Sequence, residues 1–130
     1  MALSPLMTRA SDLISANDKV NIGLIGCNGM GWANMNSLLK MDNVELTGIC
    51  DVDKNAIGKR LGDYGQLRKN KPESYGDYRK LLDDKDIDAV VIGTPDHWHC
   101  KIMVDAVMAG KHVYVEKPIA NSIAECKLMV

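Results

Sequence analysis

Four glycines lie within residues 22–31 (IGLIGCNGMG), directly after a short apolar run. Gly26 and Gly31 match the first and third glycines of the pattern G-x-G-x-x-G, in which backbone amides at the start of a helix hold a diphosphate. Asn28 occupies the second glycine position, where the backbone must approach the phosphates. Asparagine tolerates left-handed backbone better than most residues, and Gly29 adds further freedom. The sequence therefore predicts a phosphate-binding loop, with a flexible turn as the alternative.

An acidic residue follows this loop at the spacing that a dinucleotide site requires. Asp51 comes directly after the apolar segment Val44–Cys50 and 20 residues after Gly31. Its carboxylate would accept hydrogen bonds from the 2′- and 3′-hydroxyls of an adenosine ribose and would repel a 2′-phosphate. Neither Val52 nor Asp53 supplies a cation, so the sequence favours NAD over NADP. The alternative is that Asp51 only caps a helix.

Two further groups of polar residues follow apolar segments. The first is GTPDHWH at residues 93–99, and the second is EKP at residues 116–118. Lys117 would donate a hydrogen bond to a substrate hydroxyl and share in proton transfer. The alternative for Lys117 is an ordinary surface lysine on a loop.

His97 and His99, in the first of these groups, raise the question of a metal site. Cys100 is adjacent, but no further ligands cluster near it in the sequence, and a closed zinc site needs four ligands. We therefore expect no metal, and we expect one imidazole to cap the following helix or to line a cofactor cleft. Trp98, taken alone, is typical of a core residue.

The elements that must position these residues alternate along the chain. Apolar runs predict strands, and apolar residues at helical spacing predict a helix after each strand, the last beginning near Ser122. Asp53 and Asp77 are predicted to cap the N-termini of two of these helices, and Gly110 the C-terminus of another. Five alternations indicate a three-layer α/β/α domain with a doubly wound parallel sheet, the Rossmann fold. Ligands of such sheets bind beyond the carboxyl ends of the strands, where all the candidate residues fall. The predicted strands are residues 19–25, Val44–Cys50, Glu73–Tyr75, residues 88–93 and His112–Val115.

The composition is that of one soluble globular domain. The 130 residues are 46% hydrophobic and 25% charged, and a formal net charge of −1 offers no basic field to nucleic acid or to anionic lipid. No apolar run reaches the roughly 20 residues that a membrane helix needs. The cysteines form no C-x-x-C pair, so we expect reduced and mostly buried thiols at Cys27, Cys50, Cys100 and Cys126.

The two ends of the sequence differ from its middle. Residues 1–18 show no sustained periodicity, so we expect a disordered or extended tail before a domain at residues 19–130. The tail lacks the charged start and long apolar stretch of a signal peptide, which predicts a cytoplasmic protein, with export to the periplasm as the alternative if a signal was trimmed. The last helix ends on the apolar half-turn Leu128, Met129 and Val130, which indicates a fragment that stops before a second domain.

The chain resembles the N-terminal half of the Gfo/Idh/MocA oxidoreductases, the family of glucose–fructose oxidoreductase and inositol dehydrogenase. The resemblance covers residues 19–130. It rests on the glycine loop, on CDVD at residues 50–53, on DIDAVVIGTPDHWH at residues 86–99 and on AGKHVYVEKP at residues 109–118. It implies the NAD-binding domain of such an enzyme without its substrate domain.

The resemblance also implies a role for each candidate residue. Lys117 would be the catalytic residue that reaches the reacting hydroxyl, and Trp98 would lie with it on the substrate side. His97 would lie near the same end of the cofactor channel, and Glu116 near the nicotinamide ribose. The residues implied to bind the cofactor are Gly26, Asn28, Gly29, Met30, Gly31, Asp51, Thr94, Pro95, His97, His99 and Glu116.

The implied reaction moves a hydride from a carbinol carbon of a sugar or cyclitol to C4 of the nicotinamide of NAD, while a base removes the hydroxyl proton. A second domain would complete the site with a further His or Asp and would form a homo-oligomer, so this fragment alone is expected to bind NAD without turning over sugar. Two alternatives stay open. One is an NAD-dependent glycosidase that reduces and reoxidises its bound cofactor in each cycle. The other is a non-catalytic NAD-binding module, against which Glu116 and Lys117 argue.

Overall fold

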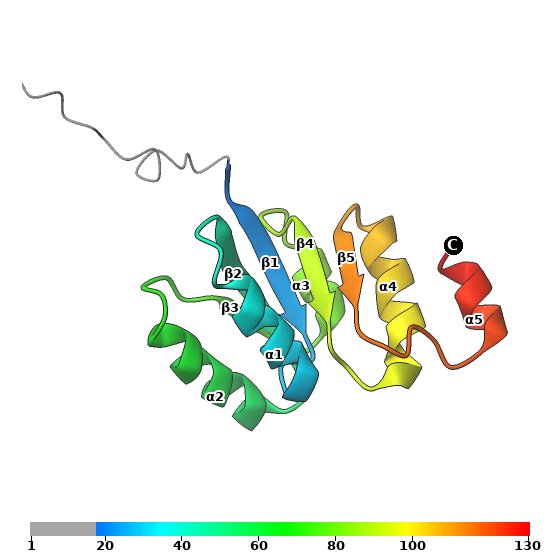
Figure 1. Cartoon of the computed structure of the whole chain (residues 1–130), viewed down its shortest axis with the longest axis horizontal. Helices are drawn as coiled ribbons and strands as arrows, with labels where there is room; N and C mark the ends of the chain where they lie inside the picture. The colour runs from blue at the N-terminus through cyan, green and yellow to red at the C-terminus, as the bar shows by residue number, and fades with distance from the viewer. Residues whose placement is uncertain (1–17) are drawn as a thin grey trace, which may run out of the picture.

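Five parallel strands form a single sheet in the order β3-β2-β1-β4-β5 (Figure 1). The computed structural model describes residues 18–130, so the tail expected at residues 1–18 lies almost wholly outside the described residues. The prediction of a doubly wound parallel sheet is confirmed. The strands are β1 (Val20–Ile25), β2 (Val44–Cys50), β3 (Glu73–Tyr75), β4 (Ala89–Ile92) and β5 (His112–Val115).

Helices cover both faces of the sheet. Those on one face contribute Met35, Ile57 and Tyr64 to one hydrophobic cluster, and those on the other face contribute Leu81 and Ile102 to a second. The first face carries α1 and α2, the second carries α3 and α4, and α5 packs on α4. The helices are α1 (Gly29–Leu38), α2 (Lys54–Gly65), α3 (Tyr78–Leu82), α4 (His99–Met108) and α5 (Ile123–Leu128), with a short 3₁₀ helix, η3 (Asp96–Trp98), before α4.

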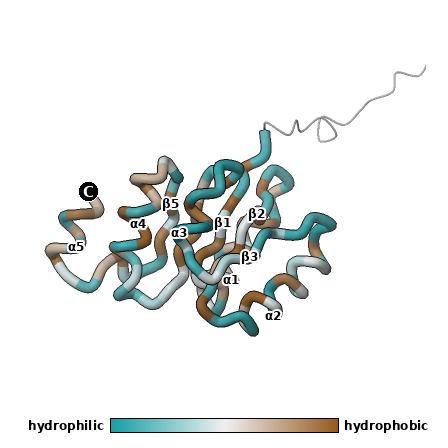
Figure 2. The backbone as a smooth tube through the Cα atoms, turned by 180° about the vertical axis from the view of Figure 1, so that it is seen from behind, coloured by the Kyte–Doolittle hydropathy of each residue, from teal (hydrophilic) through white to brown (hydrophobic). Residues whose placement is uncertain are grey.

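The central strands β1 and β4 are largely apolar and buried because helices cover both faces of the sheet. Leu24 belongs to the cluster under α1 and α2, whereas its neighbour Ile25 belongs to the cluster under α3 and α4, as the alternation of side chains along a strand requires. The hydropathy colouring of Figure 2 shows hydrophobic residues along the strands, and hydrophobic and hydrophilic residues alternating along α4. The sheet is therefore a rigid platform whose loops are free to carry chemistry.

Side chains at the helix ends behave as the sequence predicts. The Asp53 carboxylate accepts a hydrogen bond from the amide of Asn55 at 2.8 Å, and the Asp77 carboxylate accepts one from the amide of Arg79 at 3.0 Å. Gly110 follows α4 with a φ of 77°, the left-handed conformation that ends many helices. Asp53 and Asp77 thus fix where the loops after β2 and β3 end, and Gly110 fixes where the loop before β5 begins.

Helix α1 starts unusually close to the sheet because Gly31 lies in its first turn. A Cβ atom on Gly31 would collide with the carbonyl oxygen of Gly26 and would lie 3.3 Å from the Cα atom of Gly93. Gly26 has a φ of 81°, and a Cβ atom there would lie 2.6 Å from the amide nitrogen of Thr94. The first and third glycines of the loop are thus required by the junction of β1, β4 and α1.

We expect Gly31→Ala to lower the free energy of unfolding by about 3 kcal/mol, because the added methyl group meets backbone atoms that cannot move aside. Urea denaturation followed by circular dichroism measures the change. Gly62→Ala is the matched control: Gly62 is exposed within α2, nothing lies within 4 Å of an added Cβ atom, and we expect stabilisation of about 0.5–1 kcal/mol. Equal effects of the two substitutions would contradict the close contact.

Candidate functional site

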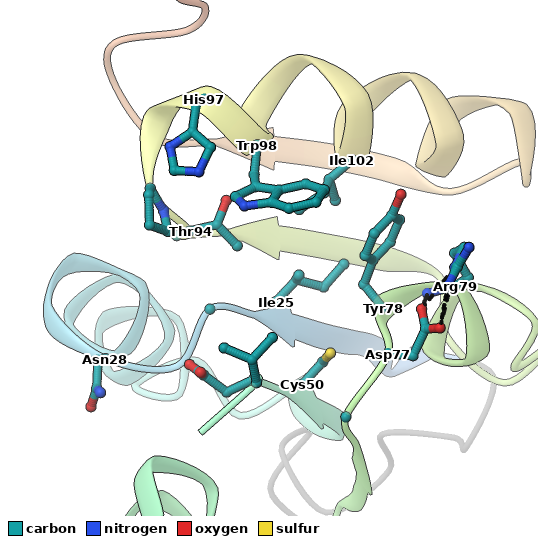
Figure 3. A pocket seen from close by; sticks show the side chains of 16 residues that line it. Ile25, Asn28, Cys50, Asp77, Tyr78, Arg79, Thr94, His97, Trp98 and Ile102 are labelled. Atoms are coloured by element: carbon teal, nitrogen blue, oxygen red, sulfur yellow. Dashed lines mark hydrogen bonds and ion pairs between the residues drawn. The ribbon is translucent and has the colours of Figure 1, made fainter. Parts of the chain in front are cut away.

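A pocket of about 600 Å³ lies beyond the carboxyl ends of the central strands (Figure 3). Strand β1 has β2 on one side and β4 on the other, so the pocket lies where the strand order reverses, the usual ligand position in such sheets. Figure 3 shows Thr94 and Trp98 across the pocket from Cys50. The loops after β1, β2, β3 and β4 all contribute to its lining.

The pocket brings together some of the candidate residues and leaves out others. Its lining includes Gly26, Asn28, Asp51, Thr94, Pro95, His97 and Trp98. Among the described candidates, those that do not line it are Gly29, Met30, Gly31, His99, Glu116 and Lys117. Residues 76–79 also line the pocket, although the sequence predicted only a helix cap at Asp77. Their position directly after β3 was the signal that identifies them.

The backbone of the glycine loop differs from our expectation at Asn28. This residue has φ −95° and ψ 170°, an extended conformation that any residue adopts, and it is the N-cap of α1. The left-handed conformation occurs one residue later, at Gly29, with φ 48°. The explanation that Asn28 is accepted for its left-handed tolerance is therefore wrong, because the chain turns into the helix at Gly29.

Asp51 holds the glycine loop with its carboxylate. Oδ2 of Asp51 accepts a hydrogen bond from the amide of Cys27 at 2.9 Å, and Oδ1 accepts one from the amide of Asp53 at 3.0 Å. The cap of α2 is Asp53, so the alternative that Asp51 only caps a helix does not hold. A carboxylate has about four acceptor positions, so Asp51 keeps free lone pairs for a ligand while the backbone fixes its orientation.

The two cysteines next to Asp51 are not nucleophiles. Burial raises the pKa of the Cys27 thiol to about 12, and the charge of Asp51 adds to the effect. Burial and the same charge raise the pKa of the Cys50 thiol to about 12. Both thiols are therefore neutral at pH 7 and act as small apolar groups. All four cysteines are free, and three of them are buried, as expected.

Thr94 supplies a polar atom that lacks a partner. Its Oγ1 atom is buried and has no hydrogen-bond partner among the residues that the structure describes. Buried hydroxyl groups are nearly always paired, so an unpaired one at a pocket indicates a ligand. Together with the amides at the start of α1 and the carboxylate of Asp51, it fits a dinucleotide cofactor.

Glu116, at the end of β5, is held by α1. Its side chain is buried, and Oε1 accepts a hydrogen bond from Nδ2 of Asn34 at 2.6 Å. Oε2 accepts one from the amide of Lys117 at 3.1 Å. The hydrogen bond from Asn34, followed by that amide, holds the pKa of Glu116 below its usual value. The sequence analysis did not single out Asn34, because a polar residue on a helix carries no motif.

His99 connects the loop after β4 to the loop after β5. The ring is 1% exposed, with Nδ1 2.7 Å from the carbonyl oxygen of Pro118 and Nε2 2.8 Å from that of Thr94. His99 is thus placed between the two loops and does not face the pocket. His97 is exposed, and its ring centroid lies 5.9 Å from that of Trp98. Trp98 is 45% exposed, so the expectation of a core residue at this position is wrong: the short 3₁₀ helix that carries it has no buried residue.

Residues 18–130 lack two other kinds of feature, a metal-binding cluster and a membrane-spanning helix. These residues contain no group of three or more His, Cys, Asp or Glu side chains that could hold a metal ion. None of the helices in the same part of the chain has both the length and the apolar character needed to span a bilayer.

Comparison with known proteins connects this geometry to a family. Residues 20–130 match the family model described as "Oxidoreductase family, NAD-binding Rossmann fold". Among curated relatives, a glycosyl hydrolase family 109 protein of Shewanella sp. (strain ANA-3) is 34% identical over 115 residues, which are 85% of this chain and 25% of that protein. The alpha-N-acetylgalactosaminidase of Shewanella oneidensis is 33% identical over 111 residues, which are 82% and 24%. The chain therefore spans about a quarter of the length of these relatives.

Solved structures of dehydrogenases share the fold. The apo scyllo-inositol dehydrogenase from Lactobacillus casei superposes with a TM-score of 0.77 at 26% identity, over 86% of this chain and 32% of that chain. The WlbA dehydrogenase from Chromobacterium violaceum, solved with NADH and UDP-GlcNAcA, gives a TM-score of 0.77 at 26% identity, over 88% and 32%.

We expect Asn34→Ala to raise the pKa of Glu116 toward the ordinary glutamate value, because the substitution removes the main hydrogen bond to its carboxylate. Since folding lowers this pKa, the contact stabilises the fold above the unfolded glutamate pKa and is lost as the pH falls through the lowered value. Asn34→Ala removes this contact, so we expect the Glu116 carboxyl to take up its proton at a higher pH and the stability of the variant to fall less as the pH is lowered. A ¹³C NMR titration of the Glu116 carboxyl measures this pKa. Asn36→Ala, on an exposed position of the same helix, should leave the titration unchanged; an unchanged titration in Asn34→Ala would disprove the assignment.

Proposed function

The chain belongs to the Gfo/Idh/MocA oxidoreductase family as its NAD-binding Rossmann domain, and we propose that it serves an enzyme that moves a hydride between a CH–OH carbon of a sugar or cyclitol and nicotinamide. The observation that carries the proposal is that Asp51 and the start of α1 adjoin one pocket at the reversal of strand order. When bound, NAD supplies the hydride acceptor, and the protein positions it.

In this proposal the pocket holds the adenosine half of the cofactor. Asp51 accepts hydrogen bonds from the two ribose hydroxyls and repels a 2′-phosphate, which favours NAD. Trp98 is 45% exposed and lines the same pocket, so its indole offers an aromatic face to adenine. We therefore propose that Trp98 contacts the adenosine half and not the substrate.

The start of α1 binds the diphosphate. The first amides of a helix have no acceptor within the helix, and the helix dipole places partial positive charge there. An added Cβ atom at Gly29 would meet nothing within 4 Å, so the approach to these amides is open. Asn28 and Gly29 are then the residues whose backbone lies nearest to the phosphates.

Lys117 acts at the reacting hydroxyl. Its amide is bound to Glu116, whose carboxylate is in turn held by Asn34, so the backbone at Lys117 is fixed from α1. In the proposed reaction the ammonium group of Lys117 donates a hydrogen bond to the substrate hydroxyl oxygen, which makes that hydroxyl easier for a separate base to deprotonate. Glu116 keeps negative charge beside this lysine because its pKa is lowered.

We expect Asp51→Ala to weaken NAD binding about tenfold and to reduce the preference for NAD over NADP, measured by calorimetric titration of both cofactors. The ratio of the two affinities is decisive. Loss of the support that Asp51 gives to Cys27 would weaken both cofactors equally, whereas loss of its charge relieves repulsion of the 2′-phosphate alone.

Asp53→Ala is the control for this experiment. Asp53 caps α2 two residues away and does not line the pocket, so its removal should lower stability and leave the ratio of affinities unchanged. An unaltered ratio in Asp51→Ala would show that the carboxylate does not face the ribose.

The curated relatives favour a second candidate. They are glycosyl hydrolase family 109 proteins, and one is an alpha-N-acetylgalactosaminidase, at 33–34% identity. An NAD-dependent glycosidase would use the same pocket and the same lysine, but it would return the hydride to the sugar in each cycle. The two candidates therefore differ in whether free NADH is formed.

This difference can be measured on the protein expressed at the full extent of its reading frame. With inositols and hexoses as substrates, we expect an oxidoreductase to form NADH, seen as a rise in absorbance at 340 nm. Release of p-nitrophenol from p-nitrophenyl α-N-acetylgalactosaminide, with no change in the amount of NADH, would identify the glycosidase. In either enzyme Lys117→Met should reduce turnover by about 10²–10⁴ and leave the NAD dissociation constant unchanged. Turnover near the wild-type value would remove Lys117 from the catalytic site.

A further inference from the structure

The residue between the first glycine of the loop and Asn28 is held at both of its backbone polar groups. The amide of Cys27 donates a hydrogen bond to Oδ2 of Asp51 at 2.9 Å, and its carbonyl oxygen accepts one from Nε of Arg60 at 3.0 Å. Asp51 follows β2, and Arg60 lies in α2. Side chains of opposite charge from two elements thus fix one residue of the glycine loop.

Arg60 is itself fixed by two other contacts. Its Nη1 atom lies 2.8 Å from Oδ2 of Asp63, one turn further along α2. The guanidinium carbon lies 5.2 Å from the centroid of the Trp32 ring, which belongs to α1. The side chain of Arg60 is 14% exposed. Because Nη1 is paired with Asp63 and the guanidinium lies over Trp32, Arg60 is held by contacts outside the loop and can fix the position of Cys27.

Rigidity at Cys27 matters to the binding of an anion. Asn28 replaces the second glycine and is extended, so the turn that presents the amides of α1 depends on where Cys27 ends. A loop that is already ordered loses less conformational entropy when a phosphate binds. The contacts of Arg60 supply this order from outside the loop.

We propose that Arg60 is a positioning residue for the diphosphate-binding loop, acting through its hydrogen bond to the carbonyl oxygen of Cys27. The inference rests on the proposed function, because it assumes that the start of α1 receives a diphosphate. Arg60 does not line the pocket, so its effect reaches the ligand through the backbone of the loop.

Three substitutions separate the hydrogen bond from the charge. Arg60→Gln places an amide N–H where Nε of arginine lies, so it keeps the hydrogen bond and removes the charge. Arg60→Lys keeps the charge without the planar group, and Arg60→Met keeps neither. The probes are ADP and adenosine, titrated into the ¹⁵N-labelled chain, with urea unfolding of each variant to show that it is folded.

We expect Arg60→Met to weaken ADP binding about tenfold and to leave adenosine binding unchanged, because only ADP uses the loop amides. Arg60→Gln should keep ADP affinity within about threefold of the wild-type value. Amide exchange at Cys27 and Asn28 should be faster in Arg60→Met than in Arg60→Gln. If Arg60 only stabilised the fold, Arg60→Met would lower the affinity for adenosine as well.

Arg68→Met is the matched control. Arg68 also donates from its guanidinium to a backbone carbonyl, that of Leu39 at 2.8 Å, but at the opposite end of α1. It should lower stability without changing ADP affinity. Wild-type ADP affinity in Arg60→Met would overturn the proposal, and so would full affinity in Arg60→Lys with loss in Arg60→Gln. A wild-type chain that binds neither ADP nor NAD would instead refute the proposed function, and with it the basis of this inference.

Discussion

The contact of the first turn of α1 with the ends of β1 and β4 is the constraint on which the site depends. The backbone of α1 touches the backbone of the strand ends there, because Gly26, Gly31 and Gly93 carry no side chains that would hold them apart. This contact fixes where α1 begins relative to the pocket, which its N-cap Asn28 lines. It also places Asn34, one turn further along the helix, where its Nδ2 atom lies 2.6 Å from Oε1 of Glu116, which follows β5. A single packing contact thus relates the glycine loop to the loop that carries Lys117.

Charged side chains near the glycine loop are held in place by hydrogen bonds to the backbone. The carboxylate of Asp51 accepts hydrogen bonds from two backbone amides, one of them that of Cys27, and Arg60, of opposite charge, donates to the carbonyl oxygen of Cys27. Groups oriented in advance need little reorganisation when a charged ligand binds, which strengthens their effect. The same carboxylate therefore serves the fold and, in the proposed function, the choice between cofactors.

The fold was largely predictable from the sequence, because buried parallel strands are continuous apolar runs and the loop glycines are sterically required. Asp53 and Asp77 were predictable as caps for the same local reason. The contact between Asn34 and Glu116 was not, since the two residues are 82 positions apart and no periodicity relates them. Asn28 misled the prediction, because the position of a positive φ within a loop depends on how the helix enters the sheet. The positive φ lies at the next residue, Gly29, so glycine was the better indicator of the left-handed conformation.

Cys27 and Cys50 flank the carboxylate that the site depends on, and both carry a pKa of about 12. Peroxides and electrophiles attack the thiolate form, which is almost unpopulated at such a pKa in neutral solution. The two thiols beside Asp51 are therefore poor targets for oxidation in neutral solution. Cys126 is the least buried of the four thiols, so among the cysteines it is the one that an oxidant in solution reaches most easily.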